Sequence, residues 1–234
     1  MNIKNVFKKL FNYFGYEIIR KPRVMVLVSK GLEINYGWMV HFLYFKELFD
    51  KIKPLEGDIV ECGVGFGRTF YQLCCLAQLE NGVRRIYGFD SFEGFPEPSK
   101  EDGSIRNPKK GQWNIATVEM VGQLLREGGI GSSFIASKVK IIKGYFEESL
   151  HQYDGGKIAF LHLDVDLYQS YKVTLEYFWS KVVKGGVVLF DEYKQPECLE
   201  RFPGASKAID EFFGDLVSQI QYHQQANRFY IIKK

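Results

Sequence analysis

Short apolar runs alternate with stretches of helical periodicity along most of the chain. From residue 55 onward, runs typical of buried strands are separated by segments with apolar residues at helical spacing. Strands are predicted at residues 58–64, 85–90, 139–143, 158–164 and 186–191. Helices are predicted at residues 68–80, 116–127, 170–182 and 205–213, with a short helix that begins at residue 146. This alternation predicts an α/β fold with a mostly parallel, doubly wound sheet.

Two segments fall outside the regular alternation. Residues 91–114 form a long polar stretch, and loops of this length in a compact domain are usually lids or disordered segments. Residues 217–223 and 228–232 both have strand character, which predicts an antiparallel hairpin at one edge of the sheet. The long stretch is a candidate lid over residues 96–113, or else a solvated basic loop, and its basic and aromatic residues include Arg106, Lys109, Lys110 and Trp113.

The N-terminal part of the chain differs from the rest in charge. Residues 1–23 hold six basic side chains and one acidic one, whereas the remainder holds 25 basic and 27 acidic ones. The total of +3 is too small to indicate a nucleic-acid partner, so we expect none. Apolar spacing predicts helices at residues 3–14 and 37–51. We therefore expect an N-terminal helical arm and cap over residues 1–54, in front of an α/β domain over residues 55–234.

The basic, amphipathic arm allows two kinds of contact. Its apolar stripe favours packing on its own domain or on a partner subunit, since burial is the commoner fate of such a stripe. The alternative is peripheral binding to an anionic membrane. We expect no membrane-spanning helix and no secretory signal. A cytoplasmic location is favoured because zinc and disulfide patterns are absent among the cysteines, Cys62, Cys74, Cys75 and Cys198.

A glycine-rich loop lies between the first strand and the first helix of the α/β domain. Its glycines, Gly63, Gly65 and Gly67, do not have the dinucleotide spacing, which disfavours a nicotinamide cofactor. Glu61 would repel a pyrophosphate but tolerate S-adenosylmethionine, whose sulfonium and ammonium groups are cationic. Asp90, at the end of the next strand, is expected to bind ribose hydroxyls. The alternative for the loop alone is a tight turn with close helix packing.

Carboxylates follow the fourth and fifth predicted strands. Asp164 ends the fourth strand, and Asp191 and Glu192 end the fifth. Because these strands are predicted neighbours, we expect the three side chains to converge, and converging carboxylates require a cation. Oxygen ligands favour Mg²⁺. The alternative, for Asp166 or Asp191 taken singly, is capping of the segment that follows it.

Four motifs together point to a known family. Residues 87–96 (YGFDSFEGFP) and 163–168 (LDVDLY), with residues 60–64 and 185–193, resemble the macrocin-type (TylF) sugar O-methyltransferase family. The resemblance covers residues 50–232. It implies a Rossmann-like class I methyltransferase fold, S-adenosylmethionine as methyl donor, Mg²⁺, a sugar-containing acceptor and a homo-oligomer.

By motif position, the resemblance also implies roles for single residues. Asp164, Asp191 and Glu192 would hold the metal, although many members have a second aspartate at the position of Glu192. Asp166 would be the general base, so Asp164 and Asp166 are the expected catalytic residues. The expected donor site combines the glycine loop, the end of the second strand and an aromatic residue suited to adenine. Its residues are Glu61, Gly63, Gly65, Gly67, Asp90, Ser91 and Phe146.

Two other functions compete with sugar methylation. A catechol-type O-methyltransferase would use the same metal chemistry, but such enzymes resemble one another in a lysine soon after the first metal aspartate, where this chain has Leu167 and Tyr168. A non-catalytic scaffold with this fold would not need acids at three strand ends. His162 is expected to be a satisfied core histidine, and packing is favoured over an acceptor-site role for Tyr168 and Tyr193.

Overall fold

The computed structural model describes residues 16–21, 24–29 and 35–234. The chain divides into two compact units, Met1–Val40 and His41–Lys234. The first contains an antiparallel hairpin of β1 (Tyr16–Lys21) and β2 (Val24–Ser29), which is absent from the elements expected from the sequence. The helix expected at residues 3–14 lies outside the described residues.

A long helix links the two units along the chain. Helix α2 (Tyr36–Ile52) confirms the prediction at residues 37–51 to within one residue at each end. Its second half carries buried apolar side chains at helical spacing, among them Phe45 and Phe49. Both rings contact Phe160 of the sheet, so this part of α2 belongs to the core of the second unit.

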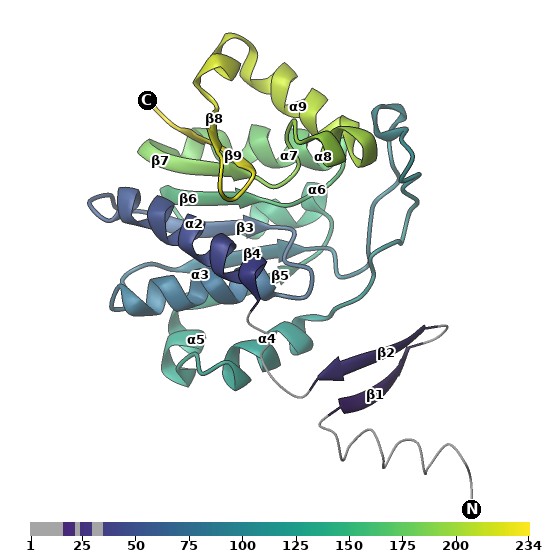
Figure 1. The fold of residues 1–234 in the computed structure, drawn as a ribbon. Helices are drawn as coiled ribbons and strands as arrows, with labels where there is room; N and C mark the ends of the chain where they lie inside the picture. The colour runs from purple at the N-terminus through teal and green to yellow at the C-terminus, as the bar shows by residue number, and fades with distance from the viewer. Residues whose placement is uncertain (1–15, 22–23, 30–34) are drawn as a thin grey trace, which may run out of the picture. The chain divides into compact units, whose positions relative to one another are not determined.

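A mixed sheet forms the centre of the second unit (Figure 1). Its strands, in order across the sheet, are β5 (Val139–Lys143), β4 (Ile86–Asp90), β3 (Asp58–Cys62), β6 (Ile158–Leu163), β7 (Val182–Phe190), β9 (Arg228–Ile232) and β8 (Gln221–His223). The first five run parallel, and β9 pairs antiparallel with both β7 and β8. The predicted doubly wound sheet and its antiparallel edge hairpin are both confirmed.

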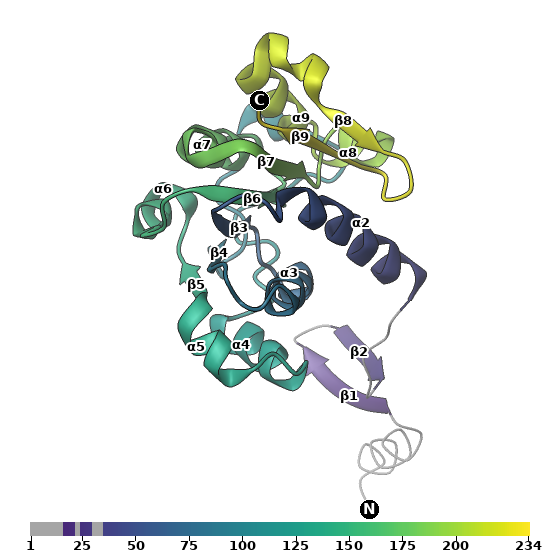
Figure 2. The same cartoon turned by 90° about the vertical axis from the view of Figure 1, so that its left-hand side faces the viewer.

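Helices cover both faces of the sheet (Figure 2). Helices α2 and α3 (Arg68–Leu79) lie on one face, and α6 (Phe146–Ser149) and α7 (Tyr168–Phe178) lie on the other. The remaining helices are α4 (Val118–Glu127), α5 (Ser132–Lys138), α8 (Pro196–Arg201) and α9 (Pro203–Phe213). Single 3₁₀ turns occur at Lys100–Asp102, Leu150–Gln152 and Trp179–Lys181.

In the second unit, two helices were not expected and one predicted strand is partly wrong. Helix α5 was not expected because it buries no side chain and so shows no apolar periodicity. Helix α8 has only six residues, too few for a periodic signal. The strand expected at residues 217–223 is wrong in its first half. Gly214–Gln219 forms a 3₁₀ helix, and β8 begins only at Gln221.

Complete burial of the two central strands, β3 and β6, explains the apolar runs at these places in the sequence. Every residue of β3 and of β6 is buried, since helices cover both faces of these strands. Asp58 begins β3, and two further polar side chains lie within the apolar runs. Glu61 on β3 and His162 on β6 are 0% and 2% exposed, and the His162 Nδ1 lies 2.8 Å from Glu61 Oε1. The interpretation of His162 as a satisfied core histidine is confirmed.

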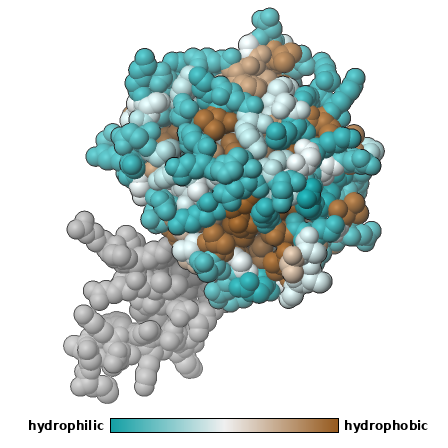
Figure 3. Space-filling model, turned by 180° about the vertical axis from the view of Figure 1, so that it is seen from behind, coloured by the Kyte–Doolittle hydropathy of each residue, from teal (hydrophilic) through white to brown (hydrophobic). Residues whose placement is uncertain are grey.

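The surface is hydrophilic over most of the face seen from behind, with hydrophobic side chains gathered in patches (Figure 3). Large apolar residues that are exposed include Leu43 and Leu79, at 58% and 74%. None of the helices in the described part of the chain combines the length and the apolarity that crossing a bilayer requires. Assembly into a homo-oligomer stays a prediction.

Candidate active site

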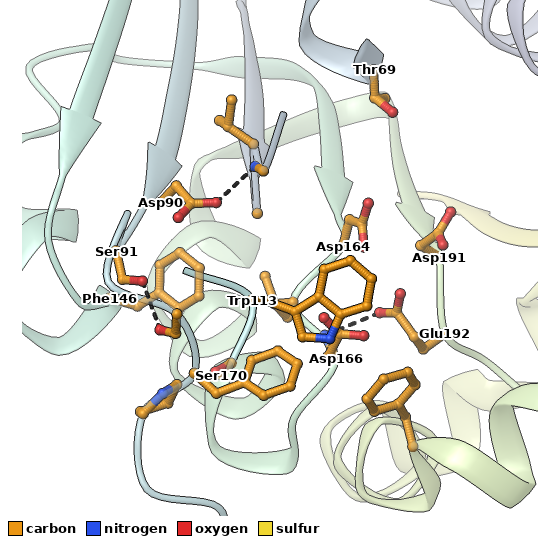
Figure 4. Close-up of a pocket in the computed structure, with 18 of the residues that line it drawn as sticks. Thr69, Asp90, Ser91, Trp113, Phe146, Asp164, Asp166, Ser170, Asp191 and Glu192 are labelled. Carbon is orange, nitrogen blue, oxygen red and sulfur yellow. Dashed lines mark hydrogen bonds between the residues drawn. The ribbon is translucent and has the colours of Figure 1, made fainter. Parts of the chain in front are cut away.

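A cavity of about 530 Å³ lies beyond the carboxyl ends of the five parallel strands. In open α/β sheets this is the edge at which ligands bind. Figure 4 shows Asp90, Ser91 and Phe146 on one side of it and Asp164, Asp191 and Glu192 on the other. The residues that follow separate strands are thus brought to one place.

Hydrogen bonds to Asp90 fix the glycine loop beside this cavity. The Gly65 N–H donates to Asp90 Oδ2 at 2.8 Å, and the Phe92 N–H donates to Asp90 Oδ1 at 2.7 Å. The main chain at Gly63 lies very close to the main chain that follows β6. A Cβ built on Gly63 would lie 1.6 Å from the Asp164 carbonyl oxygen. The loop is therefore held by Asp90 on one side and by the main chain that follows β6 on the other.

Gly63→Ala is expected to destabilise the fold by at least about 3 kcal/mol, because the new methyl group meets backbone and φ is +90°. Gly65→Ala is the matched control. It also has a positive φ, +51°, but open space around its Cβ, so a cost of about 1 kcal/mol is expected. Urea unfolding of both variants measures the difference, and equal losses would contradict this description of the loop.

Two of the residues assigned to the donor site do not line the cavity. Gly67 is the N-cap residue of α3, and a Cβ there would lie 2.9 Å from Val121 Cγ1 on α4, so its neighbour is a helix and not the cavity. Glu61 is fully buried, and burial raises its pKa although the bond to His162 acts in the opposite direction. Its Oε2 has no hydrogen-bond partner among the described residues.

The other residues assigned to the donor site from the sequence do line the cavity. Ser91 lies beside Asp90, and its Oγ donates to the Gly94 carbonyl at 2.7 Å. Phe146 begins α6 directly after β5 and presents its ring to the same end of the cavity (Figure 4). This end therefore combines a carboxylate, main-chain groups and an aromatic face.

Three carboxylates meet at the opposite end of the cavity. Asp164, Asp191 and Glu192 each offer an oxygen, and these oxygens lie within 4.8 Å of one another. The strands β6 and β7 pair directly, which is why the residues that follow them converge. Glu192 is further fixed by Tyr171, whose hydroxyl donates to its Oε2 at 2.8 Å.

Arg228 partly neutralises this cluster. It begins β9, and its Nε lies 2.7 Å from Asp191 Oδ1. Burial acts to raise the pKa of Asp191, but opposing charges led by Arg228 outweigh it, so the pKa lies below its usual value. Arg228 was not among the residues predicted for the site, because nothing in the sequence pairs the strand that carries it with β7.

Among the described residues, Asp164 and Glu192 form no ion pair of this kind. Burial, followed by the charge of Asp191, raises the pKa of Asp164 well above its usual range. Burial and the charge of Asp164 have the same effect on the pKa of Glu192. Two carboxyl groups that resist ionisation beside a third form an oxygen donor set that suits a hard divalent cation.

Asp166 lies beside the cluster in an unusual backbone conformation. Its φ is +58°, and its N–H donates to Glu192 Oε2 at 3.2 Å. Burial and the charge of Asp191 raise its pKa to about 7, although Arg106 and Arg201 act in the opposite direction. A carboxyl group with a pKa in this range can accept a proton near neutral pH.

The segment between β4 and α4 packs onto the helices that follow β6 and β7. Asp102 is 2% exposed, and its Oδ1 accepts a hydrogen bond of 2.7 Å from the Tyr168 N–H at the start of α7. The Ser104 hydroxyl donates to the Arg201 carbonyl at the end of α8, also at 2.7 Å. The segment thus forms one wall of the cavity.

Within this wall, the residues highlighted in the sequence have different positions. Trp113 lines the cavity and is 50% exposed, with its indole in front of Asp166 in Figure 4. Lys109 and Lys110 are exposed and do not line the cavity. The hydroxyls of Tyr168 and Tyr193 donate to side chains of α9 rather than lining the cavity, in agreement with the packing role favoured for both.

Comparison with known proteins agrees with this geometry. The sequence model of the macrocin-O-methyltransferase (TylF) family matches residues 45–212. The chain belongs to the TylF family. The match includes the glycine loop and the acids Asp164, Asp166, Asp191 and Glu192, so the resemblance expected from the motifs is confirmed.

Individual relatives of this TylF-family chain are distant. It is 27% identical over 145 residues to 8-demethyl-8-(2,3-dimethoxy-alpha-L-rhamnosyl)-tetracenomycin-C 4'-O-methyltransferase of Streptomyces olivaceus, covering 62% of this chain and 56% of that protein. It is 28% identical over 161 residues to demethyldecarbamoylnovobiocin O-methyltransferase of Streptomyces niveus, covering 68% and 58%. The matched segments thus span less than two thirds of either relative.

A solved structure extends the likeness to the fold. CalS11, a calicheamicin methyltransferase, superimposes with a TM-score of 0.74 at 24% identity, over 85% of this chain and 80% of that one. The Rossmann-like class I methyltransferase fold that the motifs implied is therefore confirmed.

Proposed function

We propose that the protein is an S-adenosylmethionine- and Mg²⁺-dependent O-methyltransferase that acts on a hydroxyl group of a sugar. The observation that carries this proposal is that the glycine loop bound to Asp90 and the acid cluster line the same cavity. Membership of the TylF family and relatives named as O-methyltransferases support it.

The donor end of the cavity matches the chemistry of S-adenosylmethionine. Asp90 would accept hydrogen bonds from the ribose hydroxyls, as the acid does at this position in dinucleotide-binding folds. Gly63 and Gly65 bring main chain close to the methionine moiety, and Phe146 offers an aromatic face to adenine. The negative charge across the cavity would attract the cationic sulfonium.

The acid end matches the chemistry of the acceptor. Asp164, Asp191 and Glu192 would hold Mg²⁺, which on binding a sugar hydroxyl would lower the pKa of that hydroxyl. Asp166 would take the proton that the hydroxyl loses. The methyl group would then pass from sulfur to the sugar oxygen, leaving S-adenosylhomocysteine, and the cavity walls would supply alignment of the two reactants.

A methyl-transfer assay tests this function. The purified chain is incubated with S-adenosylmethionine labelled in the methyl group and with free, phosphorylated and nucleotide-linked sugars, in Mg²⁺ or in EDTA. Label is expected in the sugar fraction only with Mg²⁺, and excess Mg²⁺ should restore transfer after chelation. Transfer unaffected by EDTA would contradict the metal, and no transfer to any sugar would contradict the acceptor class.

A further inference from the structure

Two arginine side chains near the acid end have no ionic partner in the described part of the chain. Arg201 ends α8 and lines the cavity, and Arg106 lies in the wall that carries Trp113. Neither forms an ion pair with a described residue. By contrast, the guanidinium groups of Arg84, Arg85 and Arg228 all pair with carboxylates.

Each of these two guanidinium groups is held over an aromatic ring that itself lines the cavity. The Arg106 Cζ lies 5.6 Å from the centroid of the Trp113 ring, and the Arg201 Cζ lies 5.6 Å from that of Phe202. A cation–π contact of this kind leaves the N–H donors of a guanidinium available for other partners. Both side chains can therefore still bind a ligand through these donors.

A nearby acid does not neutralise Arg201. Glu197 lies one helical turn before it on α8 and lines the same cavity, a spacing at which ion pairs commonly form. These two side chains nevertheless form no ion pair. The positive charge of Arg201 therefore remains available to an incoming group.

Both arginines lie at the cavity proposed for the acceptor. Arg201 lines this cavity together with Asp166, and Arg106 lies over Trp113, which lines it as well. The Ser104 hydroxyl, two residues before Arg106, donates to the Arg201 carbonyl, so the two arginine segments are in contact. Trp113, which is half exposed, adds a flat apolar face of the kind that packs against a sugar ring. Arg201 and Trp113 thus line the cavity together with the proposed general base, and Arg106 adds a second cation beside Trp113.

We propose that the acceptor is a phosphate-bearing sugar, with its phosphate bound by Arg106 and Arg201 and its ring against Trp113. This inference rests on the proposed sugar methylation and names the substrate class of that site. Arginine suits phosphate because its planar donors bind two oxygens at once. A phosphate carries about two negative charges, which two guanidinium groups match, whereas a sugar carboxylate carries one.

Isothermal titration of the full chain, saturated with S-adenosylhomocysteine, tests the proposal. The probes are glucose-1-phosphate, uridine-diphosphate-glucose, glucuronic acid and methyl glucoside. Both phosphate-bearing probes share the recognised group, and their relative affinities distinguish a monoester from a diphosphate. Each is expected to bind at least about tenfold more tightly than the carboxylate or neutral probe.

Substitutions assign that affinity to the two arginines. Arg106→Gln and Arg201→Gln should each weaken phosphate-sugar binding by about tenfold, and the double variant by about a hundredfold. Arg126→Gln is the matched control, since Arg126 is exposed on α4 and does not line the cavity. It should leave affinity unchanged.

Three results would overturn the proposal: no binding of either phosphate-bearing probe to the wild type, equal binding of methyl glucoside, or phosphate-sugar affinity unaffected by the double variant. Binding of S-adenosylhomocysteine is measured in the same samples. If it binds every variant equally while phosphate selectivity is absent, the inference fails and the proposed methyltransferase function stands.

Discussion

Asp164→Asn is expected to reduce methyl transfer by at least about a thousandfold while leaving affinity for S-adenosylmethionine within a few-fold of the wild type. The substitution keeps the shape of the side chain but removes one oxygen ligand and its charge. Asp164 belongs to the acid end of the cavity, whereas the donor is expected to contact the Asp90 end. The effect should therefore fall on turnover.

The melting temperature of Asp164→Asn is a second measurement, and it should not fall although activity does. Folding raises the pKa of Asp164, so its ionisation destabilises the native state as pH rises through that value. In EDTA above neutral pH, Asp164→Asn should therefore melt at or above the wild-type temperature, although it is inactive. Added Mg²⁺ should raise the melting temperature of the wild type and not that of the variant.

A distant substitution controls for general effects of losing a carboxylate. Asp215→Asn changes an exposed residue in the 3₁₀ turn before β8 and should alter neither activity nor the response to Mg²⁺. Substantial activity in Asp164→Asn, or full stabilisation of that variant by Mg²⁺, would contradict the assignment of Asp164 as a metal ligand.

Asp166→Asn is expected to lower kcat by about a hundredfold to ten-thousandfold, the usual range for loss of a general base. Asparagine tolerates the left-handed conformation that φ of +58° imposes here, so the backbone should keep its path. The amide cannot accept the proton of the acceptor hydroxyl at neutral pH.

Comparison of kinetic constants separates a general base from a binding residue. Asp166→Asn should lower kcat with little change in KM for the acceptor, and Mg²⁺ should still raise its melting temperature. Rescue of kcat by Asp166→Glu, even partial, would support proton transfer. A variant with wild-type kcat would show that another group accepts the proton.

Much of the fold was predictable because the central strands are buried on both faces. The runs that became β3 and β6 are mostly apolar, and glycines mark the turn that follows β3. Helix α5 left no such signal, since none of its side chains is buried. Periodicity reports burial, so elements that bury little are the ones it misses.

The acid cluster was also predictable, but its surroundings were not. Asp164, Asp191 and Glu192 converge because adjacent parallel strands end at the same edge. Arg228 reaches Asp191 from a strand 37 residues later in the chain. Its position depends on β9 pairing with β7, a long-range contact that local sequence patterns do not encode.

The same limit applies to Glu61. An acid before the glycine loop predicts a contact with a cationic donor, but its observed partner is His162, 101 residues away on the neighbouring strand. The side chain points into the core between two strands and does not line the cavity. The pairing of β3 with β6, which places Glu61 opposite His162, decides which side chain Glu61 meets there.

Isothermal titration with S-adenosylmethionine tests most directly whether the cavity is a methyl-donor site, because it requires no knowledge of the acceptor. The wild type should bind the donor at a single site. Asp90→Ala, which removes the acceptor for the ribose and the anchor of Gly65, should bind at least about tenfold more weakly, and Asp215→Ala should match the wild type. Absence of binding to the wild type would contradict the methyltransferase function and favour a scaffold that only keeps the fold.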